Sequence, residues 1–325
     1  MDTNDQFDSF DLYERYQERY GDLYDEQPVS GRRSRKPNAR SSERQAESVA
    51  MPETAAPEIT YQPSRFERGW LMNAVYPFFV EQLITDVLYH VRGGKEASVY
   101  CCRADPSTDA EVLAAKVYRP SQFRSLRNDA LYREGRDILT TQGRAMLGDR
   151  GRSAQKPDAR MMRAVAGKSA FGKEILQSSW LSYEFMFMER LFRAGASVPK
   201  PYACVGNAVL MSFIGDQHGA APALQSVRLA AHEAQPLFKE IMRTVEMMLA
   251  EGYIHGDLSA YNVLYWDGKA VVIDFPQVTN SERNVHARAI LERDVERICS
   301  YFARQGVESD PQAITADLWA RYVAH

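Results

Sequence analysis

One stretch constrains this chain more than any other feature: residues 254–277, IHGDLSAYNVLYWDGKAVVIDFPQ. It places Asp257, Asn262 and Asp274 among short runs of strand-forming apolar residues. A carboxylate in such surroundings is costly to bury unless it binds a metal ion, a phosphate or a proton. The stretch therefore predicts a chemically active site held by short strands and the loops between them.

Composition limits the class of protein. The chain has 325 residues, of which 45% are apolar, so it can bury a sizeable core. Its formal net charge of −3 argues against a uniformly basic nucleic-acid-binding protein. The four cysteines form no CxxC pair, which favours reduced thiols. With no signal peptide and no apolar run near the ~20 residues of a membrane span, we expect a cytoplasmic protein without a membrane partner.

Two parts of the chain are expected: a disordered tail at residues 1–65 and a single domain at 66–325. Residues 2–26 carry nine acidic and two basic side chains, whereas residues 32–44 carry one acidic and six basic side chains. Aliphatic residues are almost absent between Val29 and the end of the tail, so this part cannot build a core.

The first half of the domain, about residues 66–212, predicts a small, mostly antiparallel sheet with one important helix. A helical pattern at 65–83 precedes the strands, and the important helix is expected at 180–196. The five strands are expected within residues 84–103, which hold two of them, 111–119, 200–206 and 208–215.

The second half, about residues 213–325, predicts a reduced helical lobe. Residues 221–253 favour a helical hairpin, and residues 287–306 and 314–325 favour two closing helices. The fold class is therefore α+β and bilobal, and the cleft between two such lobes is a natural ligand site.

Residues 119–178 interrupt the first half with a polar and irregular segment. They contain thirteen Arg or Lys and six Asp or Glu, a net charge of +7. Such a segment can follow RNA phosphates by counterion release, or it can be a solvated loop. Both interpretations stay open.

The order of polar residues suits phosphoryl transfer from ATP, which needs cations against the phosphates, ligands for a metal and a carboxylate that positions the nucleophile. The glycine turn could bring backbone N–H groups against phosphate oxygens, since glycine permits close approach. The candidate nucleotide contacts around this turn are Gly93, Gly94, Lys95, Ser98 and Val99.

Lys116 lies inside the apolar strand AAKVY. It is either an edge-strand residue facing solvent or a cation that reaches the phosphates while paired with a helix carboxylate. Glu184 is the favoured partner because it shares the apolar stripe of its helix, and Glu189 is the alternative.

The motif HGDLSAYN places Asp257 and Asn262 five residues apart in a loop. Asp257 would accept or orient a proton from the nucleophile, and Asn262 would ligate a magnesium ion held mainly by phosphates. Asp274 ends an apolar strand, where a metal ion would offset the cost of its charge. Each residue alone could be a cap or turn former, but the ordered set is far more specific.

Together with GKEASVY, AAKVY, VPKPYA, LMSFIG, IDFPQ and LERDV, these motifs resemble the RIO family of atypical serine/threonine kinases and ATPases over about residues 85–305. The resemblance implies a protein-kinase-like fold that uses ATP and Mg²⁺. It implies that Lys116 binds ATP, that Asp257 is the catalytic aspartate and that Asn262 and Asp274 hold magnesium. It also implies that Asp274 can be transiently phosphorylated.

Further expectations follow from the same resemblance. Met211, Ser212 and Ile214 would lie in the hinge whose backbone binds adenine. A role in ribosome maturation is implied, with ribosomal particles or RNA as partners. Gly256 stands where ordinary kinases have the arginine of HRD, and no APE-like segment follows. The chain would phosphorylate itself or a special protein substrate, or spend ATP to change shape, and we expect a bacterial-type member.

Two other functions stay open at this point. Small-molecule phosphotransferases of the aminoglycoside or choline kinase type also use HGD, although only 48 residues (325 − 277) follow Gln277 to hold such a substrate. A nucleotide-binding scaffold without turnover is the second alternative, and the intact set of Lys116, Asp257, Asn262 and Asp274 argues against it.

Overall fold

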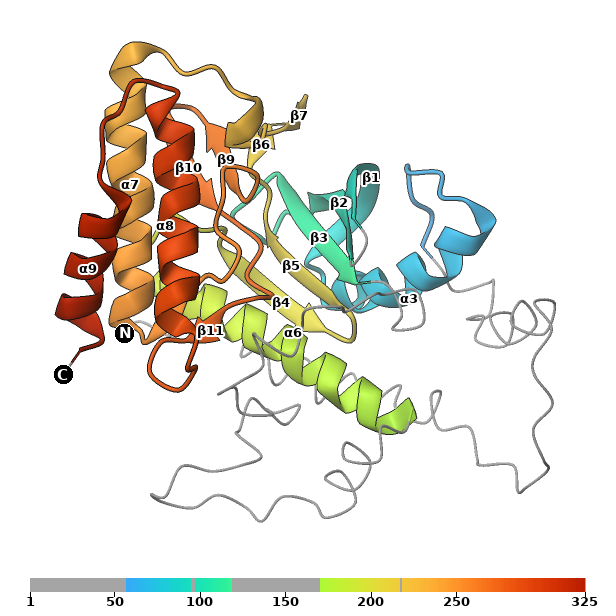
Figure 1. Cartoon of the computed structure of the whole chain (residues 1–325). Helices are drawn as coiled ribbons and strands as arrows, with labels where there is room; N and C mark the ends of the chain where they lie inside the picture. The colour runs from blue at the N-terminus through green and yellow to red at the C-terminus, as the bar shows by residue number, and fades with distance from the viewer. Residues whose placement is uncertain (1–56, 95–96, 119–169, 217, 325) are drawn as a thin grey trace, which may run out of the picture.

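The computed structural model describes residues 57–94, 97–118, 170–216 and 218–324. Most of the expected tail and most of the basic segment at 119–178 therefore lie outside the described residues. The described part is an α+β structure with two lobes (Figure 1), as the sequence predicts.

The N-lobe is built on one antiparallel five-stranded sheet with the strand order β1-β2-β3-β5-β4. This confirms the number and positions of the predicted strands. Their bounds are β1 Ile84–Gly93, β2 Ala97–Ala104, β3 Val112–Tyr118, β4 Pro201–Val205 and β5 Ala208–Ser212.

The two faces of this sheet pack against different helices. Helix α3 (Arg65–Val80), which Ser64 caps by accepting a hydrogen bond from the Glu67 amide, packs on one face. The alternate residues of β3 on that face, Leu113, Ala115 and Val117, join its core. Lys116 therefore projects from the opposite face, where helix α6 (Ala170–Arg193) packs.

Helix α6 begins earlier than the sequence predicts. The expected irregular segment ran to residue 178 and the helix from Trp180, but the helix starts at Ala170. Residues 170–178, AFGKEILQS, are polar overall yet contain good helix formers such as Ala, Lys, Glu, Leu and Gln. Their polarity is compatible with a helix and does not require irregular structure.

A short part of the expected tail packs on the N-lobe. Ile59 is buried, the Thr60 amide donates to Asp86 Oδ1 over 2.8 Å, and the Tyr61 amide donates to the Val87 carbonyl over 2.8 Å. These bonds cover the outer edge of β1, the terminal strand of the sheet. Ordered structure therefore starts before residue 65, the boundary expected from the sequence.

The C-lobe consists of helices and very short strands. Figure 1 shows α7, α8 and α9 side by side, with the sheet between them and α3. The bounds are β6 Gly215–Asp216, β7 Gly219–Ala220, η3 Leu224–Ser226, α7 Ala231–Ala250, β8 Tyr253–Ile254, β9 Val263–Trp266, β10 Lys269–Val272, β11 Thr279–Asn280, α8 Ala287–Ala303 and α9 Pro311–Tyr322. Among the helices of the described ranges, none has the length and apolar character needed to span a bilayer.

The helical hairpin predicted for residues 221–253 is wrong. Only α7 is an α-helix, and the segment before it holds just the 3₁₀ turn η3. The Gln225 amide donates to the Ala260 carbonyl, and the Tyr265 amide donates to the Pro222 carbonyl. The backbone of this segment is thus bonded to the loop and strand around Asn262 instead of to a helix of its own.

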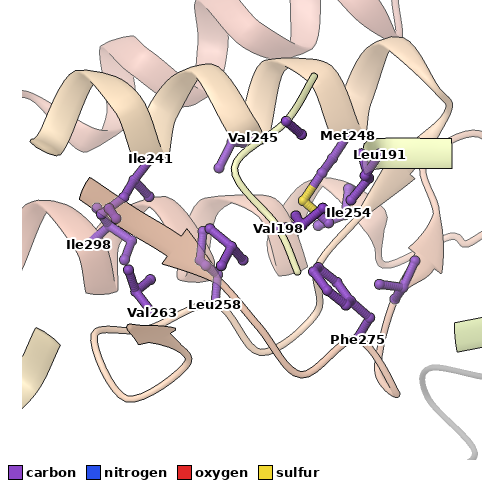
Figure 2. Close-up of a cluster of buried hydrophobic side chains, with 14 of the residues drawn as sticks. Leu191, Val198, Ile241, Val245, Met248, Ile254, Leu258, Val263, Phe275 and Ile298 are labelled. Carbon is purple, nitrogen blue, oxygen red and sulfur yellow. The ribbon is translucent and has the colours of Figure 1, made fainter. Parts of the chain in front are cut away.

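A continuous apolar core supports the loops of the 254–277 stretch. Figure 2 shows Ile241, Val245 and Met248 of α7 facing Ile254, Leu258, Val263 and Phe275. Leu258 directly follows Asp257, and Phe275 directly follows Asp274; both apolar side chains are almost fully buried. Burial of these neighbours anchors each polar residue at a fixed place in the chain.

Gly256 is held by contacts that only glycine permits. Its φ is +83°, and a Cβ at this position would lie 2.2 Å from the Gln277 carbonyl oxygen. This close approach requires glycine at position 256, because any larger residue would push Gln277 away.

We expect Gly256→Ala to lower the free energy of unfolding by about 3 kcal/mol, measured by chemical denaturation, since it adds a clash to a left-handed backbone. Gly252→Ala is the matched control: its φ is +82°, but nothing lies within 4 Å of the added Cβ. That variant should lose about 1 kcal/mol. Equal losses in the two variants would show that the Gln277 contact is unimportant.

Candidate active site

The ammonium group of Lys116 contacts one carboxylate from each lobe. Its Nζ lies 2.7 Å from Glu184 Oε1 on α6 and 2.7 Å from Asp274 Oδ1 in the C-lobe. The Tyr118 hydroxyl donates to the other oxygen of Glu184. Glu184, not Glu189, is therefore the carboxylate beside Lys116, and Glu189 pairs with Arg193 one helical turn further along α6.

Neighbouring opposite charges keep the Lys116 ammonium and the Asp274 carboxylate ionised. Burial opposes the charge on Lys116, but the carboxylates of Asp274 and Glu184 raise its pKa well above the ordinary value. Burial likewise works against the Asp274 carboxylate, yet the Lys116 ammonium holds the pKa of Asp274 below its usual value. The pair is therefore a stable ammonium–carboxylate contact, in line with the cost of leaving either charge alone.

Asp257 and Asn262 lie in the loop between β8 and β9. The Asn262 Nδ2 group donates to the Asp257 carbonyl over 2.8 Å and to Asp257 Oδ2 over 3.3 Å. The Asn262 carbonyl accepts from the Ile273 amide over 2.9 Å. Because Ile273 directly precedes Asp274, this bond brings the loop next to the residue that contacts Lys116.

Backbone geometry aims the Asp274 side chain. Asp274 lies two residues beyond the end of β10 and has a φ of +72°, which is unusual for a residue with a side chain. Its side chain is 41% exposed, so it is less buried than a strand-terminal position suggests. Four predicted residues, Lys116, Asp257, Asn262 and Asp274, are thus connected at the junction of the lobes.

His255 contributes a support that sequence reasoning missed. Its Nε2 donates to the Ile273 carbonyl over 3.1 Å, and its Nδ1 accepts from the Asp257 amide over 3.3 Å. Both peptide groups of Ile273 are therefore bonded to the HGD loop. His255 is almost fully buried, and the signal in the sequence was a histidine two residues before Asp257.

Helix α8 supplies further residues to which the sequence analysis assigned no role, among them Arg293 and Asp294 of the LERDV motif. Asp294 Oδ2 accepts from the Gly256 amide over 2.8 Å, and Arg293 donates to the Gly256 carbonyl. Arg297 Nη1 lies 2.8 Å from Asp257 Oδ1. Asp294 stands between Leu291, Val295 and Ile298 on the buried side of the helix, and burial raises its pKa. An acid within an apolar stripe could have indicated Asp294, but no sequence signal indicated Arg297.

The residues predicted to contact the nucleotide lie on both faces of the sheet. Val99 lies opposite Lys116 in the β2–β3 pairing and shares its face, and Met211 of β5 lies on that face too. Ser98 is 2% exposed and belongs to the face covered by α3, so its hydroxyl is not available beside Lys116. The Ser98 side chain faces away from Lys116 because strand residues alternate between faces, and its contact with phosphate stays a prediction.

The turn between β1 and β2 is closed by a bond from the Gly94 amide to the Ala97 carbonyl over 2.8 Å. A Cβ on Gly94 would lie 3.1 Å from that carbonyl, so the turn favours glycine. Gly93 ends β1, and Lys95 lies outside the described residues. Their contacts with phosphate stay predictions.

The expected hinge has several backbone groups already in use. The Ser212 amide donates to the Lys200 carbonyl over 2.8 Å, and Ser212 Oγ accepts from the Lys200 amide. The Ile214 carbonyl accepts from the Ala221 amide. Adenine recognition by Met211, Ser212 and Ile214 therefore stays a prediction, with the Ser212 amide the least available group.

The donor set fits magnesium better than a metal held by protein alone. Within the described ranges, no group of three or more His, Cys, Asp or Glu side chains could hold a metal ion. Asn262 uses its amide nitrogen in the two bonds to Asp257, so its side-chain oxygen takes no part in them. Two oxygen ligands suit Mg²⁺, which usually keeps waters and takes phosphate oxygens as its other ligands.

Comparisons with known proteins identify one family. A family model described as the RIO domain matches residues 152–314. The RIO-type serine/threonine-protein kinase Rio1 of Haloferax volcanii is 29% identical over 310 residues, which cover 94% of each chain. Rio1 of Thermoplasma acidophilum is 30% identical over 135 residues, 42% of this chain and 69% of that protein.

A eukaryotic relative matches a smaller part of its own length. The human serine/threonine-protein kinase RIO1 is 25% identical over 234 residues, 72% of this chain but only 36% of that protein. The expectation of a bacterial-type member stays a prediction, since these relatives are archaeal and eukaryotic. The matched domain spans half of the chain, and the chain belongs to the RIO family of serine/threonine-protein kinases.

Proposed function

We propose that this RIO-family kinase binds ATP with Mg²⁺ at the junction of its lobes and transfers the γ-phosphoryl group. One observation carries the proposal: the Lys116 ammonium lies between Glu184 and Asp274, while Asn262, which donates to Asp257, accepts from the backbone amide of Ile273, the residue before Asp274. A cation, two metal-ligating oxygens and a carboxylate for the nucleophile are the parts that phosphoryl transfer needs.

Lys116 holds the α- and β-phosphates in this proposal. Glu184 and Tyr118 support it, because the carboxylate bonds the ammonium on one oxygen and the tyrosine hydroxyl on the other. Lys116 therefore stays aimed at the junction when its contact with Asp274 opens. When the Asp274 carboxylate moves away from Lys116, the negative charge of the triphosphate takes its place, so the ammonium is not left unpaired.

Asn262 and Asp274 would hold Mg²⁺, which when bound neutralises the charge that develops on the phosphate oxygens. Asp257 orients the attacking hydroxyl, or the water that later cleaves an acyl-phosphate, and accepts its proton through a carboxylate oxygen. The apolar anchors Leu258 and Phe275 keep these two aspartates at a fixed separation.

The acceptor of the phosphoryl group distinguishes a kinase from an ATPase. In the first case a serine or threonine hydroxyl, of this chain or of a protein substrate, attacks the γ-phosphorus and ADP leaves. In the second, an Asp274 carboxylate oxygen attacks, ADP leaves, and water later cleaves the acyl-phosphate to give inorganic phosphate. We propose the second route for the basal cycle, since Asp274 is 41% exposed.

The biological setting of the proposal comes from the family. A role in ribosome maturation rests on the family resemblance, with the basic segment at 119–178 as the candidate RNA contact. A cytoplasmic location agrees with the four cysteines, all of which are free thiols. Family membership favours this function over a small-molecule phosphotransferase.

Asp257→Ala should lower the Mg²⁺-dependent turnover of ATP by about 100-fold or more while ATP binding stays nearly unchanged, because it removes the group that orients the nucleophile. Asp274→Ala should also weaken nucleotide binding in the presence of Mg²⁺, because it removes a metal ligand. Phosphate release and equilibrium binding of a fluorescent ATP analogue measure the two effects.

Asp317→Ala is the control for both variants, since Asp317 lies on α9 and its side chain is 62% exposed. It should behave like the parent protein. If Asp257→Ala and Asp274→Ala hydrolyse ATP at the parent rate as well, the assignment of this site is wrong.

Incubation with γ-labelled ATP identifies the acceptor. We expect a label on the parent protein that is acid-labile and is released by hydroxylamine, as an acyl-phosphate is, and no such label on Asp274→Ala. A label that survives both treatments and maps to serine or threonine would instead establish the kinase route.

Neutralising the arginines within residues 119–178 should weaken binding to RNA and flatten its salt dependence. The log–log slope should change by about 0.9 for each RNA phosphate that the variant no longer neutralises. Neutralising the six basic residues of 32–44 removes positive charge from another place and is the control, best compared with a variant that loses six of the ten arginines of 119–178. Unchanged affinity and slope in the first variant would leave the segment without a role in RNA binding.

A further inference from the structure

Asp257 has a partner from a distant part of the chain. Arg297 on α8 places its Nη1 atom 2.8 Å from Asp257 Oδ1, and the two residues are 40 positions apart. On the other carboxylate oxygen, Oδ2, Asn262 donates over 3.3 Å. The carboxylate is therefore held by one donor on each oxygen, which restricts its rotation about the Cβ–Cγ bond.

Three residues of helix α8 contact the loop that holds Gly256 and Asp257. Arg293 and Asp294 bond the carbonyl and the amide of Gly256, so they fix the backbone of the loop. Arg297 lies one helical turn after Arg293 and reaches the side chain of the next residue, Asp257. The backbone and the carboxylate are thus positioned by the same helix through separate contacts.

The exposure of the pair points to function more than to stability. The side chains of Arg297 and Asp257 are each 41% exposed. Ion pairs at such exposure contribute little to folding, because water already solvates both charges. Asp294, by contrast, is 2% exposed and belongs to the buried framework of the lobe.

We propose that Arg297 is a positioning residue for phosphoryl transfer: it holds the Asp257 carboxylate turned toward the attacking group. This inference rests on the proposed role of Asp257. A carboxylate held in this way keeps lone pairs for a hydrogen bond from the nucleophile, and its fixed direction brings the nucleophile into line with the phosphorus.

The test compares three variants by ATP turnover with Mg²⁺. Arg297→Ala should lower kcat by about 10- to 100-fold and leave KM for ATP within about 2-fold, since it affects the orientation of the nucleophile and not the nucleotide. Arg297→Lys, a point charge without the planar fork, should fall between Ala and the parent. Arg288→Ala removes the same charge from an exposed position on the same helix and should match the parent.

A rescue experiment separates positioning from a merely structural role. Guanidinium chloride at concentrations below unfolding should restore part of the kcat of Arg297→Ala, because the free cation can occupy the place beside Asp257. The same concentration of sodium chloride should not. The midpoint of thermal unfolding should be nearly equal in the parent, Arg297→Ala and Arg288→Ala.

The outcomes separate this inference from the function on which it rests. A parent protein without Mg²⁺-dependent turnover of ATP overturns the proposed function and the inference together. An active parent with Arg297→Ala at the same kcat overturns the inference alone. So does a loss that appears only in KM, one that guanidinium fails to restore, or one matched by Arg288→Ala.

Discussion

The contact of one ammonium with two carboxylates organises this protein. Lys116 comes from the middle of the N-lobe sheet, Glu184 from the helix behind it and Asp274 from the C-lobe. An unpaired charge at 12% exposure, as for the Lys116 side chain, would be costly, so Lys116 requires carboxylate partners. The contact therefore brings residues of both lobes together, and it places the charges that phosphoryl transfer needs at the same point.

The rest of the C-lobe turns this contact into a site of defined geometry. The apolar core holds Leu258 and Phe275, and hydrogen bonds to both peptide groups of Ile273 tie the HGD loop to the strand end. Helix α8 then fixes Gly256 from the other side through Asp294. Short strands and loops, which have little stability alone, are thereby held by a helix and a core that are stable.

Much of the site could be predicted from the sequence because its chemistry depends on residue type and order. Lys116 within an apolar strand, and Glu184 on the inner stripe of its helix, were sufficient to predict their pairing. The errors arose where tertiary contacts decide. Residues 222–226 bond to the loop around Asn262 and form no hairpin. Arg297 could not be found, since its contact joins residues 40 positions apart without any motif.

The most direct test of the central claim is a crystal structure of the protein with Mg²⁺ and a non-hydrolysable ATP analogue. We expect Lys116 to keep its contact with Glu184 while its bond to Asp274 is replaced by α- and β-phosphate oxygens. Asn262 and Asp274 should lie about 2.1 Å from the metal. A nucleotide bound away from this junction, or one bound there with the Lys116–Asp274 pair intact and no metal at Asn262, would contradict the account.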